Sequence, residues 1–450
     1  MTVTQVYMDN CSHCHGDNGE GGGAGSATLL TKELFDQAHD RGFFDAIKDG
    51  VPDRAMPAYG GVWPDNMIWG LVVHIRELQA KALRAKYGSP KPDAKGIYHS
   101  KHHNFKMETV IKEGLGLSTP WAIDWLPDGK MLITNRPGAL VVFEKGALRP
   151  VEGVPTSIQL GQGGLLDITV HPDYKSNGWI YMAYAEPDEK GAAMTKIVRG
   201  KLVFGKRIRW TSQQTIFQAP KDSYNKSGNH FGSRIVFDGK RHIYFSIGER
   251  GQQDLAQDPG KPNGKIFRVN EDGTVPPDNP FLGGKGLPEV WSYGHRNPQG
   301  LAIDLNGNVF DTEHGPRGGD EFNLIKKGAN YGWPKAIYSI NYDDVPMTFP
   351  WPRDGVAYEA PLLRWLPSCA TCGLAVVRGP KFGKWKGDLL AGGLAGKNLD
   401  RIRVKGGKVV EHEELLQGMG RVRDVAYGPD GAIYLVLNGP DEVDRLVEAP

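Results

Sequence analysis

The chain has 450 residues, of which 39% are hydrophobic, and a formal net charge of +2. This length suits one small and one large domain, or two or three domains, and the near-neutral balance implies no strongly charged partner. Basic runs interleaved with aromatic residues are absent, and no apolar run approaches about 18 residues, so we expect neither nucleic-acid binding nor a membrane span. The 60 glycines and 31 prolines predict many turns and a β-rich architecture.

The first chemical motif is the run Cys11-Ser12-His13-Cys14-His15. Two thiols on one short turn can add to the two vinyl groups of a porphyrin, and the adjacent imidazole then reaches the iron. The alternatives are a redox CxxC pair or half of a zinc site, but zinc would need a second Cys/His pair at matching spacing. The motif therefore predicts haem c, with Cys11 and Cys14 as thioethers and His15 as the proximal ligand.

The sixth iron ligand should be a Met or a His. Met56 directly precedes a proline in the loop 51–58, and enough chain separates it from His15 to cross the haem. We expect Met56 to be this ligand, with His39 and His74 as alternatives. Packing in a hydrophobic core is the plainer role of such a methionine.

Helical spacing of apolar residues predicts helices over residues 32–49 and 65–86, on either side of that loop. Residues 1–88 therefore resemble a small, all-α class I cytochrome c. Haem is attached to cytochromes c outside the cytoplasm, so the resemblance implies an exported, periplasmic protein. The chain does not open on a charged and apolar leader, and we expect that one has been removed.

Residues 89–105 are polar and rich in proline and histidine, which is typical of a linker. Beyond them one theme recurs: an apolar strand, a turn with Gly or Asp, and a second strand. The six copies span residues 122–134, 167–183, 233–248, 301–313, 374–393 and 425–437. Asp-Gly turns close such hairpins because glycine tolerates positive φ. The repeat predicts an all-β six-bladed β-propeller over residues 106–450, with seven blades as the alternative.

Several polar, glycine-rich stretches adjoin these repeats. They span residues 161–167, 227–234, 293–300, 312–321, 330–334 and 420–424. Arginines in such loops suit a ligand with several carboxylates, because guanidinium groups pair with carboxylates bidentately. His230 could exchange a proton at neutral pH. The turn at Gly315-Pro316 can direct backbone carbonyls toward a Ca²⁺ ion.

At these stretches, over roughly residues 105–448, the chain resembles the soluble PQQ-dependent aldose and glucose dehydrogenases. The most specific parts are His-Arg-Asn-Pro-Gln-Gly at 295–300 and Glu-His-Gly-Pro-Arg-Gly-Gly-Asp-Glu at 313–321. The resemblance implies PQQ and Ca²⁺ as cofactors. It places the contacts to PQQ at Gln162, Arg296, Asn297, Arg421 and Arg423.

The resemblance also implies catalytic roles. His230 would take the hydroxyl proton from the sugar C1 while hydride passes to PQQ, and Arg296 would stabilise the charge that grows on the quinone oxygen. The backbone oxygens of Gly315 and Pro316 would hold Ca²⁺, supported by Asp320.

The sequence departs from this family in three places. Asn229 stands where the soluble glucose enzyme has an Asp beside its base. The family's PQQ-binding Lys aligns with Ala395, and Lys397, two positions on, is the candidate PQQ contact in its place. Cys369 and Cys372 replace a cysteine-free stretch, and a disulfide that staples the loop is the expectation in an oxidising compartment, with redox and metal-binding roles as alternatives.

Taken together, the two halves predict a quinoprotein dehydrogenase. Electrons would pass from an aldose sugar or related alcohol to PQQ, then one at a time to the chain's own haem and to an external redox protein. A flexible linker would raise the effective concentration of the haem to roughly mM. The alternatives are a lactonase-type hydrolase with an attached cytochrome, and a non-enzymatic electron-transfer or docking protein. Candidate walls of the substrate pocket are Tyr338, Asn341, Tyr342, Trp351 and Trp365.

Overall fold

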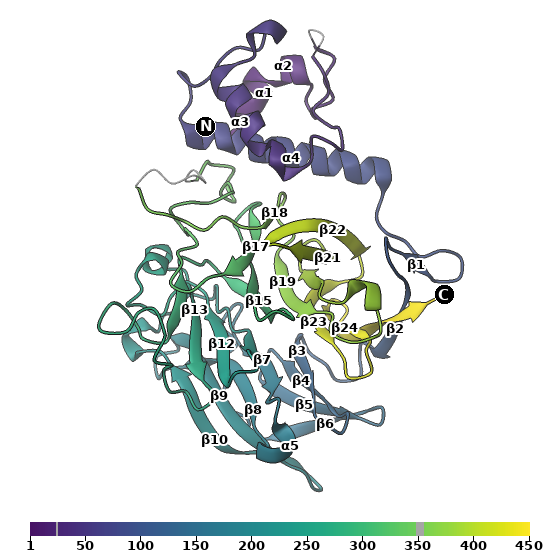
Figure 1. Cartoon of the computed structure of the whole chain (residues 1–450), viewed down its shortest axis with the longest axis vertical. Helices are drawn as coiled ribbons and strands as arrows, with labels where there is room; N and C mark the ends of the chain where they lie inside the picture. Colours follow the sequence, from purple (N-terminus) through teal and green to yellow (C-terminus); the bar gives the residue numbers. More distant parts are fainter. Residues whose placement is uncertain (24–25, 348–354) are drawn as a thin grey trace.

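The computed structural model describes residues 1–23, 26–347 and 355–450. Helices gather near the N-terminus, and strands make up most of the regular structure that follows (Figure 1). We call residues 1–88 the N-terminal part and residues 104–450 the β part. In Figure 1 the purple helices of the N-terminal part lie together at one end of the molecule.

The N-terminal part confirms one predicted helix and shortens the other. The helix expected over residues 65–86 is present, and it ends at Gly88, whose φ of +73° suits glycine. Of the helix expected over residues 32–49, only the second half is α-helical, because Asp36 caps a short 3-10 turn before it. The helices are α1 (Val3–Asn10), α2 (Ser12–His15), η2 (Gln37–His39), α3 (Asp40–Asp49), η3 (Pro52–Arg54) and α4 (Asp65–Tyr87), where η marks a 3-10 helix.

Helix α4 is the central element of the N-terminal part. All its residues from Met67 to Arg76 are buried, so this stretch must be covered on every side. The hydrophobic cluster around it includes Val6 of α1 and Phe44 of α3, and also Tyr338 and Ile340 of the β part. The helix therefore belongs to two packing interfaces at once.

The β part is built of four-stranded units that follow one another along the chain. The first contains β3 (Pro120–Trp125), β4 (Met131–Asn135), β5 (Ala139–Glu144) and β6 (Ala147–Glu152), and the second β7 (Leu165–Val170), β8 (Ile180–Pro187), β9 (Ala193–Val203) and β10 (Ile208–Gln218). The third contains β11 (Ile235–Phe237), β12 (His242–Ile247), β13 (Lys265–Asn270) and β14 (Val290–Tyr293), and the fourth β15 (Pro298–Ile303), β16 (Val309–Glu313), β17 (Asp320–Ile325) and β18 (Leu363–Trp365). The fifth contains β19 (Thr371–Val376), β20 (Leu389–Gly393), β21 (Asn398–Lys405) and β22 (Lys408–Gln417), and the last β23 (Arg421–Tyr427), β24 (Ile433–Asn438), β25 (Glu442–Ala449) and β2 (Asn104–Ile111). In the described ranges of the β part, short helices also lie between strands: α5 (Tyr174–Asn177), η4 (Lys221–Ser223), η5 (Gln253–Gln257) and η6 (Gly383–Trp385).

The units are arranged in a circle, as in a propeller. The first strand of each unit contacts the first strand of the next, and β23 contacts β3. A parallel pairing of β6 with β10 joins the first two units into one eight-stranded sheet. The segment expected as a linker contributes β1 (Tyr98–His99), which pairs with β2, and β2 pairs with β25 near the C-terminus. A strand from before the repeats thus completes the last sheet.

Each predicted hairpin coincides with the first two strands of a unit. The expected Asp-Gly and Asn-Gly turns are present, and Gly129, Gly239, Gly307 and Gly431 all have positive φ. Among the described residues, none of the helices has the length and apolar character needed to cross a membrane.

Candidate functional site

The CxxCH run forms a single helical turn at the end of α1. The backbone N–H groups of Cys14 and His15 both donate to the carbonyl of Cys11, at 3.2 and 2.9 Å. Both thiols are free, and His15 Nδ1 is buried without a hydrogen-bond partner among the described residues. Burial lowers the pKa of His15, which keeps its imidazole neutral, as a metal ligand must be. The hydroxyl of Tyr7 donates to Gly16 O at 2.8 Å and anchors the turn.

The candidate axial ligands fall in different surroundings. Met56 is half-buried, forms a short bridge with Val51 and packs against the hydrophobic cluster that Cys11 also contacts. His39 is exposed. His74 is buried in α4 with its ring 4.8 Å from that of Tyr7, and neither ring nitrogen has a partner among the described residues. The structure thus leaves half-buried Met56 and buried His74 as the candidates that are not exposed.

A cavity of about 240 Å³ lies among the first strands of the units and the loops that adjoin them. It contains three of the sequence-predicted residues, Gln162, Arg421 and Arg423. Asn297 borders it, since its Oδ1 accepts hydrogen bonds from Gly232 N and Gln299 Nε2, both at 3.2 Å. The lining residues are Trp121, Arg136, Gln162, Leu166, Phe231, Gly232, Gln299, His314, Ala370, Leu394, Arg421 and Arg423.

Three arginines converge on this cavity: Arg136, Arg421 and Arg423. Burial, and then repulsion from Arg423, lowers the pKa of both Arg136 and Arg421. The nearest polar contacts of Arg423 are long, 3.3 Å to Asn438 Oδ1 and 3.4 Å to Gln299 Oε1. Mutually repelling cations around one cavity favour an anionic ligand. Arg136 was not predicted, because it follows an ordinary strand and carries no motif.

His230 lies beside the cavity, and its imidazole ring is hydrogen-bonded to a carboxylate. Its Nδ1 hydrogen-bonds to Glu249, and its backbone N–H donates to Gln162 Oε1 at 2.9 Å. Burial lowers the pKa of His230 and nearby Arg296 lowers it further, whereas Glu249 raises it. A neutral imidazole whose Nδ1–H is held by a carboxylate leaves Nε2 to accept a proton. Asn229, expected beside the base, is exposed.

The loop that carries His230 is fixed by Arg250. This buried arginine donates to the carbonyls of Asn229 and Ser227, and its guanidinium lies 3.4 Å from the centre of the Phe231 ring. His230 itself has a φ of +55°, which places its side chain in a position that an extended backbone would not allow. Neither Glu249 nor Arg250 was predicted, since both follow β12 outside the glycine-rich stretches.

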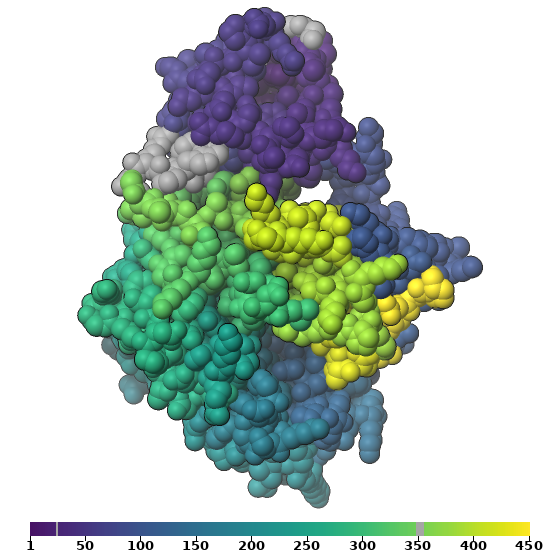
Figure 2. All heavy atoms as spheres, in the orientation of Figure 1, coloured from purple at the N-terminus to yellow at the C-terminus, as the bar shows by residue number. Residues whose placement is uncertain are grey.

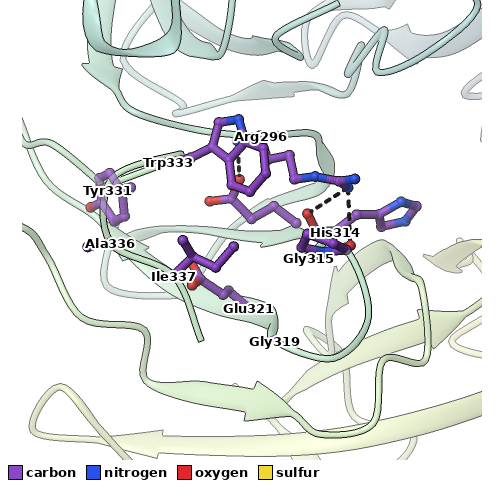
Figure 3. Close-up of a pocket in the computed structure, with 11 residues that line it drawn as sticks. Arg296, His314, Gly315, Gly319, Glu321, Tyr331, Trp333, Ala336 and Ile337 are labelled. Carbon is purple, nitrogen blue, oxygen red and sulfur yellow. Dashed lines mark hydrogen bonds between the residues drawn. The ribbon is translucent and has the colours of Figure 1, made fainter. Parts of the chain in front are cut away.

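Arg296 lies against the loop that follows β16 (Figure 3). Its Nη1 donates to His314 O at 3.2 Å and Gly315 O at 3.1 Å, and its backbone N–H donates to Glu313 Oε2 at 2.7 Å. The guanidinium also lies 5.1 Å from the centre of the Trp333 ring.

Asp320 holds the same loop from the other end. Its carboxylate accepts from the backbone N–H groups of Gly315 at 2.9 Å and Thr371 at 3.0 Å, and from the Ser368 hydroxyl at 2.6 Å. Asp320 therefore shapes the loop that presents the carbonyls of Gly315 and Pro316.

His314 connects the two halves of the site. It lines the arginine cavity and also a small cavity of about 20 Å³ beneath Arg296, which Pro316 lines as well (Figure 3). Burial and the charge of Arg296 lower the pKa of His314 to about 3, so its imidazole is neutral. The sequence motif contains His314, but no role was predicted for it.

A buried acidic group lies next to the small cavity. One ligand atom each of His295, Asp311 and Glu313 falls within 4.8 Å of the others, a grouping that could hold a metal ion. Burial and then the charge of Glu313 raise the pKa of Asp311 well above its usual range. The sequence did not single out these residues as metal ligands.

Other expected positions lie outside the cavity. Ala395 and Lys397 are exposed, and Lys397 is not among the residues that line it. Cys369 and Cys372 are buried free thiols, so the expected disulfide is not formed. The Cys372 thiol instead lies 3.6 Å from Arg423 Nη1.

The candidate pocket walls also lie elsewhere. Tyr338 packs in the cluster around α4, Tyr342 is exposed, and Trp365 donates to Asp400 at 2.7 Å. Asn341 is half-buried in the same loop as Tyr338, and Trp351 falls outside the described residues.

Comparisons with known proteins agree with this division. Residues 117–446 match the family described as Glucose / Sorbosone dehydrogenase, and residues 1–75 match Cytochrome C oxidase, cbb3-type, subunit III. Aldose sugar dehydrogenase YliI of Escherichia coli (strain K12) is 41% identical over 329 residues, which cover 72% of this chain and 88% of that protein.

Two solved structures extend the likeness to three dimensions. A crystal structure of glucose dehydrogenase is 39% identical with a TM-score of 0.71, covering 77% of this chain and 99% of its own. The PQQ-bound aldose sugar dehydrogenase of Streptomyces coelicolor is 30% identical with a TM-score of 0.63, covering 77% and 98%. The chain therefore belongs to the glucose and sorbosone dehydrogenase family of PQQ-type sugar dehydrogenases, and it carries a cytochrome c domain at its N-terminal end.

Proposed function

We propose that this protein oxidises the C1 hydroxyl of an aldose, or a related alcohol, to the lactone or carbonyl level with PQQ. Electrons then pass to its own haem c and on to an external redox protein. The observation that carries the proposal is the cavity where Arg136, Arg421 and Arg423 converge, with the neutral base His230 beside it.

The architecture we infer is a six-bladed β-propeller, each four-stranded unit being one blade. The circular contacts of the first strands support this count. We propose domain boundaries of 1–88 for the cytochrome, 89–105 for the connection and 106–450 for the propeller.

The positive charge of the cavity suits the negatively charged PQQ. PQQ carries three carboxylates, which guanidinium groups can pair with in the fork geometry. Arg421 and Arg423 would hold these carboxylates, with Arg136 as a third partner, and Gln162 and Asn297 would supply polar contacts. Lys397 lies outside this set and would contact PQQ only by moving. When bound, PQQ supplies a quinone that accepts two electrons from the sugar carbon.

His230 would act as the general base. Its lowered pKa keeps it unprotonated at neutral pH, and Glu249 stabilises the imidazolium that forms when Nε2 takes the hydroxyl proton. Arg296 would stabilise negative charge that develops on the acceptor side. Its guanidinium is already oriented by the carbonyls of His314 and Gly315, so little reorganisation is needed.

The N-terminal motif would bind haem c. The free thiols of Cys11 and Cys14 would form the thioethers, and the buried, unpartnered imidazole of His15 would be the proximal ligand. Met56 is the proposed distal ligand, and His74 is the alternative.

Calcium is proposed at the carbonyl oxygens of Gly315 and Pro316, with Asp320 holding the loop. The Gly315 oxygen accepts one hydrogen bond from Arg296 and keeps a second lone pair for a cation. An exported, periplasmic location is proposed because haem c is attached outside the cytoplasm. A lactonase-type hydrolase has less support, since the cavity is lined by arginines rather than by metal-binding carboxylates.

The test is PQQ-dependent reduction of an artificial dye by purified, haem-loaded protein. Aldoses and simple alcohols are added in turn, with Ca²⁺ supplied or removed by a chelator. We expect dye reduction only with PQQ and a sugar, and a loss of rate on chelation. Absence of turnover for every substrate, together with no binding of PQQ by the cavity, would refute the proposal and favour a docking role.

A further inference from the structure

We infer that the cytochrome domain is permanently docked on the β part, where α4 packs against residues 314–319. We call these residues, whose carbonyls Arg296 contacts, the active-site loop. We infer further that electrons pass to the haem through this interface. The inference rests on the proposed function for its electron-transfer half. In a docked protein the haem is not carried on a flexible linker. The proposed PQQ and haem sites are instead separated by the active-site loop and α4.

The apolar part of the interface follows one side of α4. The ring of Trp69 meets Tyr338 edge-on, with centroids 5.8 Å apart. A Cβ at Gly70 would lie 3.4 Å from a methyl of Ile340, which places this part of α4 within van der Waals reach of the β part. In Figure 2 the purple N-terminal part meets the green segment of the β part, and an opening is visible beside this contact.

The next turns of α4 reach the active-site loop itself. A Cβ at Gly318 would lie 3.5 Å from Val73 Cγ1. One turn further on, Glu77 accepts a bidentate pair from Arg317, at 3.0 and 2.9 Å. Arg317 also donates to Asp344 at 2.9 Å, and Asp344 accepts from the N–H groups at the start of α1. The Glu77–Arg317 ion pair thus belongs to a network that joins the β part to two helices of the N-terminal part, α4 and α1.

A second ionic cluster bridges the two parts beside a cavity of about 860 Å³ that residues of both parts line. Asp40 of α3 pairs with Arg76 of α4 and with Arg364 of the β part. Asp40 and Arg76 are only 3% and 2% exposed, so the carboxylate is shielded from water and satisfied partly across the interface. Separation of the two parts would break this pairing and expose the apolar contact between α4 and the β part to water. The docked state is therefore favoured.

The connecting segment is also held against the β part. Arg84, near the end of α4, pairs with Glu414 at 2.7 Å, and Ser89 donates to Gln417 at 2.8 Å. His102 lies 2.9 Å from Glu411. These contacts leave little of the chain free to act as a flexible tether.

The docked loop and helix lie between the two proposed cofactor sites. On one side of the loop, Gly315 O accepts from Arg296. On α4 itself, His74 packs on Tyr7, whose hydroxyl bonds to Gly16 O next to His15, the proposed haem ligand. Where Trp69, Gly70 and Val73 contact the β part directly, an electron would need no domain motion to cross, although a cavity separates later turns of α4 from the β part.

The experiment compares Glu77→Gln with the matched control Glu33→Gln, an exposed glutamate of the same domain. Hydrogen–deuterium exchange of residues 314–319 is measured in haem-loaded protein without PQQ. We expect protection in wild type and in Glu33→Gln, and exchange roughly tenfold faster in Glu77→Gln, because a charged hydrogen-bond pair is lost.

The electron route is read separately, from the rate of haem reduction after mixing PQQ-loaded protein with sugar in buffers of rising glycerol content. Docking predicts a wild-type rate insensitive to viscosity, and a slower, viscosity-dependent rate in Glu77→Gln with dye reduction unchanged. A wild-type rate that falls with viscosity, or unchanged exchange and haem reduction in Glu77→Gln, would overturn the inference. Loss of dye reduction in wild type would instead refute the proposed function, and the exchange measurement would still test docking.

Discussion

At the residue scale, the proposed chemistry depends on the pair of His230 and Glu249. Sequence analysis identified His230 from a glycine-rich stretch, and noted that its neighbour Asn229 stands where the soluble glucose enzyme has an Asp beside its base. In the structure Asn229 is exposed, and the partner of His230 is Glu249, which follows β12. Sequence order could not reveal this, because a positive φ at His230 turns the ring away from its chain neighbour.

Replacing either member of the pair should change the pH profile in a defined way. Burial holds the pKa of His230 below its ordinary 6.5, so wild-type kcat/KM should fall only when the pH drops below that value. His230→Asn should lower kcat by roughly 10²–10⁴-fold, as loss of a general base does. Glu249→Gln should lower the plateau rate and move the acid limb to still lower pH, because Glu249 raises the pKa of His230.

Steady-state dye reduction between pH 4 and pH 9 checks this. An acid limb that stays in place in Glu249→Gln, with unchanged thermal unfolding, would show that Glu249 does not tune the base.

At the element scale, local signals decided what could be predicted. Each unit's first hairpin was found because an Asp-Gly or similar turn joins two short apolar strands, as around Gly129 and Gly431. The third and fourth strands of the units were not identified, since strands such as β10 are long, irregular in register and largely polar on one face. The residue range of helix α4 was predicted almost in full, but the packing of this helix against the β part was not.

Packing of α4 against α1 gives a matched pair of glycine substitutions. A Cβ at Gly70 in α4 would lie 2.8 Å from Val3 Cγ2, whereas Gly42 in α3 has open space around it. Gly42→Ala should stabilise the protein by about 0.5–1 kcal/mol, the usual gain in a helix. Gly70→Ala should destabilise it by roughly 1–3 kcal/mol, because the stiff valine must move.

Thermal unfolding of the haem-loaded protein distinguishes the two. Equal stabilisation by both substitutions would mean that α4 is not tightly packed against α1.

At the scale of the whole molecule, one arginine ties the circle of units together. Arg234 pairs with Asp167 of the second unit at 2.9 Å and with Asp424 of the last at 2.8 Å, and it covers the Trp121 ring. Burial raises the pKa of Asp167 to about 7 even with this partner present. Such contacts join strands that are far apart in sequence, so neither they nor the domain interface could be predicted from local patterns.

Removing this cation should destabilise the protein in a pH-dependent manner. Arg234→Met should cost about 3–5 kcal/mol near neutral pH, because two buried carboxylates lose their partner. Their folded-state pKa values rise further above the unfolded values, so stability should fall as the pH rises from about 4 through the folded pKa. Urea unfolding at pH 5 and pH 8 checks the sign. The exposed Arg207→Met is the control and should change little at either pH.

The central claim is that electrons from sugar oxidation in the β part pass to the chain's own haem. The most direct measurement is a single turnover followed through the visible haem bands, after protein loaded with haem, PQQ and Ca²⁺ is mixed with an aldose. The account predicts that ferric haem turns ferrous only when both PQQ and sugar are present, at a rate independent of protein concentration. Haem that stays ferric while an added dye is reduced would contradict it.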